Sequence, residues 1–314
     1  MNPYAEIAAY LVRIRPARTW SELQDLIHNT ATRRPHHWRL PLLACEATGS
    51  AVQRALPAAA AVACMHMSIM LLDDMLDADR DGLYRQLGMP ATANLAAALQ
   101  SLALQALASG HLPPSLKRSM MASINCATLV TAYGQYLDVQ HIVDETAYWR
   151  VTRLKSAPFF GAALHTGALA AAAPSSTARS LRQFGRLYGE IVQIHDDLKD
   201  VFARPASPDW RANSAALPIL FAETVNHPQR QRFATLKRRV AEQDALLEAQ
   251  SILIRCGAVS YCVDQALRRH GLMRQLLSTI PLEVPAPLED LLEALIAPIE
   301  ALIDGITLPS ATAN

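Results

Sequence analysis

Apolar residues recur at helical spacing along almost the whole chain, and no convincing stretch alternates with a period of two. Apolar side chains that repeat every three to four residues indicate a helix with a buried face, whereas strict alternation indicates a strand. The pattern therefore predicts an all-α fold. The expected helices cover residues 5–12, 20–30, 40–47, 56–78, 92–108, 114–140, 147–173, 177–202, 215–225, 229–256, 258–278 and 288–306.

The chain is long and apolar enough to form one large helical domain. It has 314 residues, of which 51% are hydrophobic and only 18% are charged. A chain of this size buries a sizeable core without a disulfide or a metal staple. Prolines punctuate the pattern, but no low-complexity linker divides it. We expect a single domain over residues 1–314, with its core at about 20–306 and a disordered tail at 307–314.

Charge and targeting features argue against several classes of partner. The formal net charge is +1, so nucleic acid is not an expected partner. Residues 55–72 approach membrane-spanning length, but they contain His66 and run into Asp73, which favours a buried core helix without stable membrane insertion. The first 20 residues carry charges that a signal-peptide core lacks, and the five cysteines are scattered like free thiols. We therefore expect a cytoplasmic protein.

Two short acidic sequences interrupt this apolar background: DDMLD at residues 73–77 and DDLKD at residues 196–200. In each, the first and last aspartates are four residues apart, so on a helix their carboxylates project from the same face. Clustered carboxylates repel one another unless a cation neutralises them. One such cluster is often only a solvated helix end, but two that each close an apolar helix favour a shared site.

The residue types in the two acidic sequences favour one class of metal. Hard oxygen ligands without an accompanying cluster of histidines or cysteines favour Mg²⁺ over zinc, with Mn²⁺ as a substitute. Magnesium shares its coordination shell with water and with substrate phosphate oxygens. The sequence thus predicts a diphosphate held between two motifs through magnesium, whose ligands, or residues touching the ligands, are Asp73, Asp74, Asp77, Asp196, Asp197 and Asp200.

With these two motifs the chain resembles the trans-isoprenyl diphosphate synthases of the polyprenyl synthetase family. Three further segments resemble motifs of that family: Lys155-Ser156-Ala157, Gly134-Gln135-x-x-Asp138, and Gln193 three residues before the second acidic motif. The likeness covers roughly residues 25 to 305. It implies an isoprenoid synthase helical bundle around a deep apolar cavity, with the two motifs facing each other, in a homodimer that binds an allylic prenyl diphosphate.

The resemblance also assigns roles to individual residues. Lys155 is expected to contact the allylic diphosphate, and Ser156 and Gln193 to stabilise positive charge during catalysis. In the family, the fifth and fourth residues before the first motif, here Ser68 and Ile69, face the growing chain. Neither is aromatic, so a donor of fifteen carbons or more is expected to fit. The expected substrate-binding residues are Arg34, His66, Arg80, Arg85, Gln135, Lys155 and Lys199.

Departures from the family pattern fall on the side that binds isopentenyl diphosphate. The family's Gly-Lys-Arg segment is represented by Arg33-Arg34-Pro35, and its Arg-Arg-Gly after the first motif by a single arginine, either Arg80 or Arg85. Each lost charge-assisted contact weakens binding by about 1.5–3 kcal/mol. The residues that bind the allylic diphosphate are mostly kept, so the donor side is expected to be intact and the acceptor side altered.

Three functions follow from this pattern. The first is a Mg²⁺-dependent prenyltransferase that ionises a C10–C20 allylic diphosphate and transfers the prenyl group to isopentenyl diphosphate or another acceptor. The second is a terpene cyclase or synthase that uses the allylic diphosphate alone. The third is a non-catalytic partner subunit of a heteromeric prenyl synthase. Two intact acidic motifs argue against the third, because a silent subunit has no need of clustered, mutually repelling carboxylates.

Overall fold

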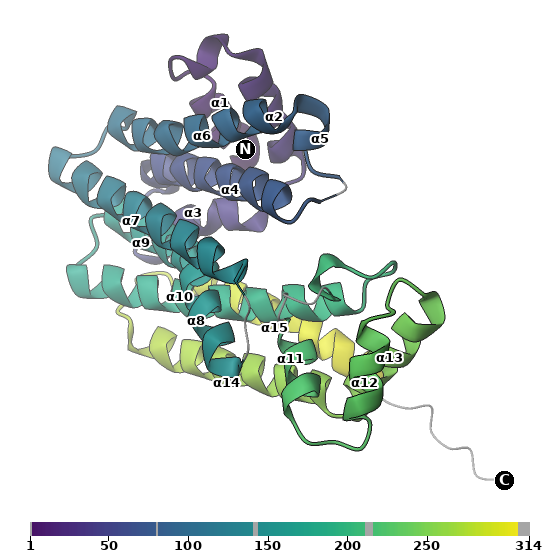
Figure 1. The fold of residues 1–314 in the computed structure, drawn as a ribbon. Coiled ribbons are helices and arrows are strands. Elements are labelled where there is room, and N and C mark those ends of the chain that lie inside the picture. Colours follow the sequence, from purple (N-terminus) through teal and green to yellow (C-terminus); the bar gives the residue numbers. More distant parts are fainter. Residues whose placement is uncertain (1, 80, 141–143, 211–215, 307–314) are drawn as a thin grey trace.

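The computed structural model describes residues 2–79, 81–140, 144–210 and 216–306. Throughout these residues the chain is helical and forms no strand, which confirms the all-α prediction (Figure 1). Four short 3₁₀ helices lie between the longer elements, at Ala17–Thr19, His36–Arg39, Val52–Ala55 and Pro208–Trp210. The predicted tail at 307–314 lies outside the described residues.

The α-helices follow one another through short connections. In chain order they are α1 (Pro3–Leu11), α2 (Ser21–Thr32), α3 (Leu40–Ala47), α4 (Leu56–Leu76), α5 (Tyr84–Leu87), α6 (Met89–Ser109), α7 (Pro114–Asp138), α8 (Glu145–Lys155), α9 (Ala157–Ala170), α10 (Ser175–Val201), α11 (Leu217–Thr224), α12 (Arg230–Lys237), α13 (Gln243–Arg255), α14 (Ala258–Thr279) and α15 (Ala286–Ile306).

Two of the expected helices are each divided in the structure. The stretch predicted as 147–173 forms α8 and α9, which meet at Ser156. Pro158 occupies the first turn of α9, where a proline is tolerated, but inside a continuous helix its ring would clash with the preceding turn. The stretch predicted as 229–256 forms α12 and α13. The sequence also gave no indication of the short helix α5.

Helix α4 lies inside the bundle between α6 and α9, with α1 against it as well. Residues from Ala58 to Met67 are buried on nearly every face except at His66, so this helix is apolar all round rather than amphipathic. By length and composition the segment Val52–Leu76 could cross a membrane, but most of it is enclosed by the other helices of this fold. Its C-terminal end delivers the first acidic motif.

Two glycines allow the helices around the second motif to approach closely. A Cβ atom on Gly134 of α7 would lie 2.3 Å from the backbone nitrogen of Lys155. A Cβ atom on Gly189 of α10 would lie 2.9 Å from the Cα atom of Ala157. Both distances are too short for any larger residue without backbone movement. These glycines therefore bring the junction of α8 and α9 against both α7 and α10.

Candidate active site

One cavity of about 640 Å³ receives side chains from both acidic motifs. Asp73 and Asp77 reach it from the end of α4, and Asp196 and Asp200 reach it from the end of α10. We call this part the acidic end. The structure thus brings together, across one cavity, two motifs that lie more than a hundred residues apart in the sequence.

Lys155 links the acidic end to α7. Its Nζ donates a hydrogen bond to Oδ2 of Asp138 at 2.6 Å and lies 3.2 Å from Oδ1 of Asp73. Burial by itself lowers the pKa of this lysine, but the carboxylates of Asp73 and Asp138 outweigh that effect and raise the pKa above its usual value. Lys155 is therefore a permanent cation at the edge of the first acidic motif.

The carboxylates at the acidic end fit a magnesium site that is completed by substrate. Oδ1 of Asp73 is shielded from solvent, and the Nζ of Lys155 at 3.2 Å is the one charged partner given for it among the described residues. The protein atoms around Asp196, and after them the charge of Asp200, raise the pKa of Asp196 to about 6. A pKa raised in this way indicates that too little positive charge lies nearby to stabilise the carboxylate. Among the described residues no three acidic, histidine or cysteine side chains form a closed metal cage. Magnesium suits such an open site, because it binds one or two carboxylates and keeps waters and phosphate oxygens as its other ligands.

Asp197 differs from the other aspartates of its motif. The sequence predicts it as a metal ligand or as a residue that touches the ligands. Asp197 is only 3% exposed, and both of its carboxylate oxygens have protein partners. Oδ1 accepts a hydrogen bond from Gln193 at 2.9 Å, and Oδ2 accepts from Tyr148 at 2.7 Å and from the backbone N–H of Leu217 at 2.8 Å. Burial raises the pKa of Asp197 to about 7, although these three bonds lower it. We therefore assign Asp197 to holding its neighbours in place rather than to metal binding.

A chain of hydrogen bonds connects Asp197 to the helix break at Ser156. The Oγ of Ser156 donates to Oε1 of Gln193 at 2.5 Å, and Nε2 of Gln193 donates to Asp197. Ser156 and Gln193 both line the cavity, so this chain fixes two polar groups on its wall. Their roles in catalysis stay predictions.

Several residues predicted for the site do not line the cavity. Arg34 is exposed in a turn with a positive φ of 51°. Arg85 lies over the ring of Tyr84, and Lys199 is exposed, although its charge lowers the pKa of Asp196. Arg80 lies outside the described residues. The predicted residues placed outside the cavity lining are Arg34, Asp74, Arg85, Gln135 and Lys199.

The other part of the cavity is aromatic, and sequence reasoning missed much of it. This aromatic end is formed by His37, His66, Ile69, Phe159 and Phe160. The rings of His37 and His66 lie with their centres 4.0 Å apart, and the ring of His37 meets Phe159 edge-on at 5.4 Å. His66 and Ile69 were expected here from their positions before the first motif. The run of two histidines and a tryptophan at residues 36–38 was the available signal for His37, but it falls between predicted helices.

Of the two residues expected to face the growing chain, only Ile69 lines the cavity. Ser68 is 2% exposed and points toward α6, where its Oγ donates to the carbonyl of Ala96 at 3.0 Å and accepts from Gln100 at 3.1 Å. The expectation for Ser68 was wrong, because consecutive helical residues point about 100° apart and α6 takes the face that Ser68 presents.

Ile69→Phe is expected to shift donor preference toward shorter chains, because a larger ring on this wall narrows the cavity. Ser68→Phe is the matched variant on the neighbouring position. It should lower stability by about 1–3 kcal/mol through overpacking against α6, without a specific change in donor preference. Relative rates with geranyl, farnesyl and geranylgeranyl diphosphate, together with melting temperatures, separate the two. A chain-length shift from Ser68→Phe and none from Ile69→Phe would reverse the assignment.

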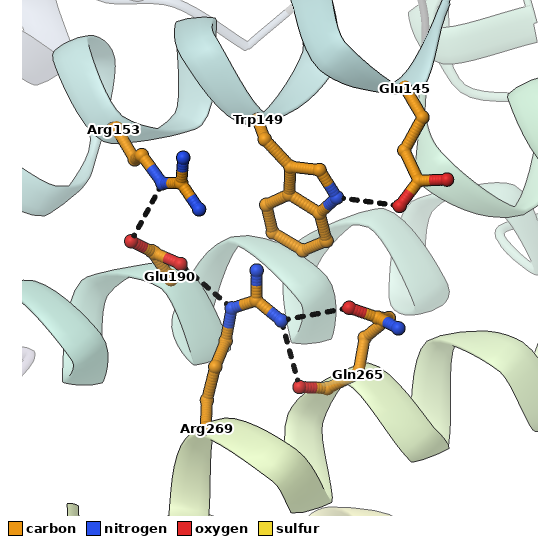
Figure 2. Close-up of polar contacts among 6 residues, drawn as sticks. All are labelled: Glu145, Trp149, Arg153, Glu190, Gln265 and Arg269. Carbon is orange, nitrogen blue, oxygen red and sulfur yellow. Dashed lines mark hydrogen bonds and ion pairs between the residues drawn. The ribbon is translucent and has the colours of Figure 1, made fainter. Parts of the chain in front are cut away.

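A buried polar network joins α8 to α10 and α14. Figure 2 shows the guanidinium of Arg269 between the ring of Trp149 and the carboxylate of Glu190: it lies 3.6 Å from the ring centre, and its Nε donates to Glu190 at 2.8 Å. Arg153 donates to the other oxygen of Glu190 at 3.3 Å, and the indole N–H of Trp149 donates to Glu145 at 2.8 Å. Since α8 ends in the cavity lysine and α10 carries the second motif, this network holds the two in a fixed spacing.

Comparisons with known proteins agree with this architecture. The sequence model of the polyprenyl synthetase family matches residues 24–253. A geranylgeranyl diphosphate synthase of Methanosarcina mazei is 33% identical over 175 residues, 52% of this chain and 53% of that protein, so the match spans about half of its length. A geranylfarnesyl diphosphate synthase of Aeropyrum pernix is 28% identical over 77% of this chain and 81% of its own.

The same fold occurs in solved structures. The crystal structure of a geranylgeranyl pyrophosphate synthetase from Pyrococcus horikoshii superposes with a TM-score of 0.81 at 21% identity, covering 94% of each chain. The all-helical fold, the matched family segment and the two acidic motifs all point to one assignment. This chain belongs to the polyprenyl synthetase family of prenyltransferases.

Proposed function

We propose that this chain is a Mg²⁺-dependent prenyltransferase that ionises an allylic prenyl diphosphate of ten to twenty carbons and transfers the prenyl group to isopentenyl diphosphate or another acceptor. The observation that carries the proposal is that both acidic motifs and Lys155 line one cavity whose other end is aromatic. The relatives named as geranylgeranyl and geranylfarnesyl diphosphate synthases support it.

Different residues of the cavity have different roles in ionisation. When bound, Mg²⁺ supplies Lewis-acid stabilisation of the leaving diphosphate, and the residues placed to hold it are Asp73, Asp77, Asp196 and Asp200. Lys155 adds a fixed positive charge beside Asp73. The aromatic end accepts the hydrocarbon part and keeps water away from the reactive cation. No protein nucleophile is needed.

A second candidate function is terpene cyclisation or elimination from the allylic diphosphate alone. One observation favours it: of the lysines and arginines in the described part of the chain, only Lys155 lines the cavity. A second diphosphate, as in isopentenyl diphosphate, would need several such groups. Both candidates share the ionisation step and differ in what captures the cation.

We also propose that the enzyme works as a homodimer. Helix α7 exposes Leu129, Tyr133 and Tyr136, large side chains spaced three or four residues apart. Such spacing places them along one strip of the helix surface, which a second copy can cover. The cytoplasmic location stays a prediction.

Supplying geranyl, farnesyl or geranylgeranyl diphosphate with Mg²⁺ is expected to release inorganic diphosphate from at least one donor. The cavity holds the carboxylates and the cation that ionisation needs, so release should stop when the metal is chelated. Released diphosphate is measured directly, and organic extracts are analysed by mass spectrometry. If diphosphate is released from none of the three donors, either with or without isopentenyl diphosphate, the result would contradict the proposed function.

A further inference from the structure

We propose that the aromatic end of the cavity binds an uncharged group rather than a second diphosphate, and that His37 determines this selectivity. The group in question is a carbon–carbon double bond, supplied either by the tail of the donor itself or by a separate neutral isoprenoid. The proposal rests on the proposed function, because it concerns what meets the allylic cation formed in the same cavity.

The two helices that carry the acidic motifs place the aromatic end within reach of the donor. On α4, His66 precedes Asp73 by seven residues, which is about 10 Å along a helix axis. On α10, Tyr188 precedes Asp196 by eight residues, and its ring packs on Phe160 with 5.1 Å between centres. A diphosphate held at the acidic end therefore has its hydrocarbon part directed toward the histidine pair.

Charge at this end does not suit an anion. None of the five residues that form this end is a lysine or an arginine, and among the described residues one lysine lines the cavity as a whole. That lysine is already engaged with Asp73 and Asp138 at the acidic end. A diphosphate carries multiple negative charges, and burying it without cationic partners is strongly unfavourable. A neutral alkene meets no such penalty at this end.

The histidine pair is built to stay neutral. The indole N–H of Trp38, a fully buried residue, donates to Nδ1 of His66 at 3.1 Å, so the neutral ring of His66 carries its proton on Nε2. The ring of His37 lies tilted against this ring with 4.0 Å between the ring centres, so protonating both would place two positive charges side by side. Burial lowers the pKa of His66 to about 4, and burial followed by the charge of His66 lowers that of His37 well below its usual value. Both rings are therefore uncharged at neutral pH.

The other ring contacts of His37 are with Phe159 and Phe160, so aromatic rings form this wall of the cavity. Its ring is edge-on to Phe159 at 5.4 Å and to Phe160 at 6.3 Å, and those two rings are edge-on to each other at 5.0 Å. Nε2 of His37 is buried and has no hydrogen-bond partner. Aromatic faces attract cations and pack well on double bonds, so this wall suits a substrate on which positive charge moves along a hydrocarbon chain.

The test compares wild type with His37→Lys and His37→Gln, each incubated with farnesyl diphosphate and Mg²⁺, alone, with isopentenyl diphosphate, or with farnesol as a neutral isoprenoid. Wild type should not add five-carbon units from micromolar isopentenyl diphosphate. His37→Lys should elongate at a rate at least about tenfold above the wild-type background, as one added charge-assisted contact predicts. His37→Gln, which adds no charge, should show no such gain. Circular dichroism and melting temperature establish that each variant is folded.

A second measurement does not depend on any variant. Millimolar isopentenyl diphosphate should neither slow the consumption of farnesyl diphosphate by wild type nor enter the product. Products formed from the donor alone would show that the double bond at the aromatic end comes from the tail of the donor. Products that appear only with farnesol would show that it comes from a separate lipid. Both results support the proposal. Efficient elongation by wild type, or a folded His37→Lys that gains none, overturns it while leaving the proposed function intact. Absence of diphosphate release under every condition overturns both.

Discussion

Asp73→Asn and Asp196→Asn are each expected to lower turnover by about two orders of magnitude or more, the cost of removing one electrostatic contact at a reacting centre. Both side chains line the acidic end from opposite motifs, and an amide cannot supply the negative charge that holds a metal ion. Steady-state release of diphosphate from an allylic donor, titrated against Mg²⁺, measures the loss. Near-normal turnover in either variant would show that the metal assignment is wrong.

The structure offers a matched control within the first motif. Asp74 adjoins Asp73 but does not line the cavity, and it packs beside Gly82 in the loop before α5. Asp74→Asn should therefore cost much less turnover than Asp73→Asn. Stability without ligand should be unchanged or higher in the Asp196 variant, because the surrounding protein atoms, and after them the charge of Asp200, already raise the pKa of Asp196. An equal loss from Asp74→Asn would show that the two neighbours share one role.

The fold and the acidic end could be predicted because their signals are local. Helical periodicity is visible within any window of a dozen residues, and each DDxxD sequence carries its own spacing. Lys155 was predicted from the resemblance of Lys155-Ser156-Ala157 to a family motif, which is also a local signal. What these signals share is that no distant residue is needed to interpret them.

The parts that escaped prediction depend on distant partners. Asp197 has the same sequence context as its motif neighbours, and only Tyr148 and Leu217, 49 and 20 residues away, show that its oxygens are occupied. Ser68 and Ile69 are adjacent, and the position of α6 decides which of them faces the cavity. His37 reaches the cavity from a segment between predicted helices, where periodicity gives no information.

One miss had a local signal. The apolar pattern continues across residues 147–173, so periodicity alone predicts one helix. Pro158 indicates a helix start instead, because proline is favoured in the first turn and disfavoured inside. The resulting break matters for the site, since it turns Ser156 toward Gln193 rather than leaving it in a continuous helix.

Lys155→Gln is expected to lower kcat/KM for the allylic diphosphate by about two orders of magnitude. This loss is somewhat larger than the loss expected from removing one charge-assisted contact with the substrate, because the lysine also neutralises the first motif. Its raised pKa keeps it charged across the working pH range. Among the described residues no other lysine or arginine lines the cavity to replace that charge when the diphosphate leaves. Lys155→Arg should recover only part of the activity, because a planar guanidinium fits a point-charge site poorly. Lys117 lies near the far end of α7 from Asp138, where its Nζ donates to the carbonyl of Ala108 at 2.8 Å. Lys117→Gln is therefore the control away from the cavity and should change kcat/KM little.

Stability measurements separate the role of Lys155 toward substrate from its role in the fold. Removing the ammonium leaves the carboxylates of Asp73 and Asp138 facing each other without a cation, so Lys155→Gln should also melt at a lower temperature. Adding Asp138→Asn removes one of these charges and should restore the melting temperature without restoring turnover. Recovery of both by the double variant would mean that Lys155 acts only through the fold, and that the cation needed for ionisation lies elsewhere in the chain.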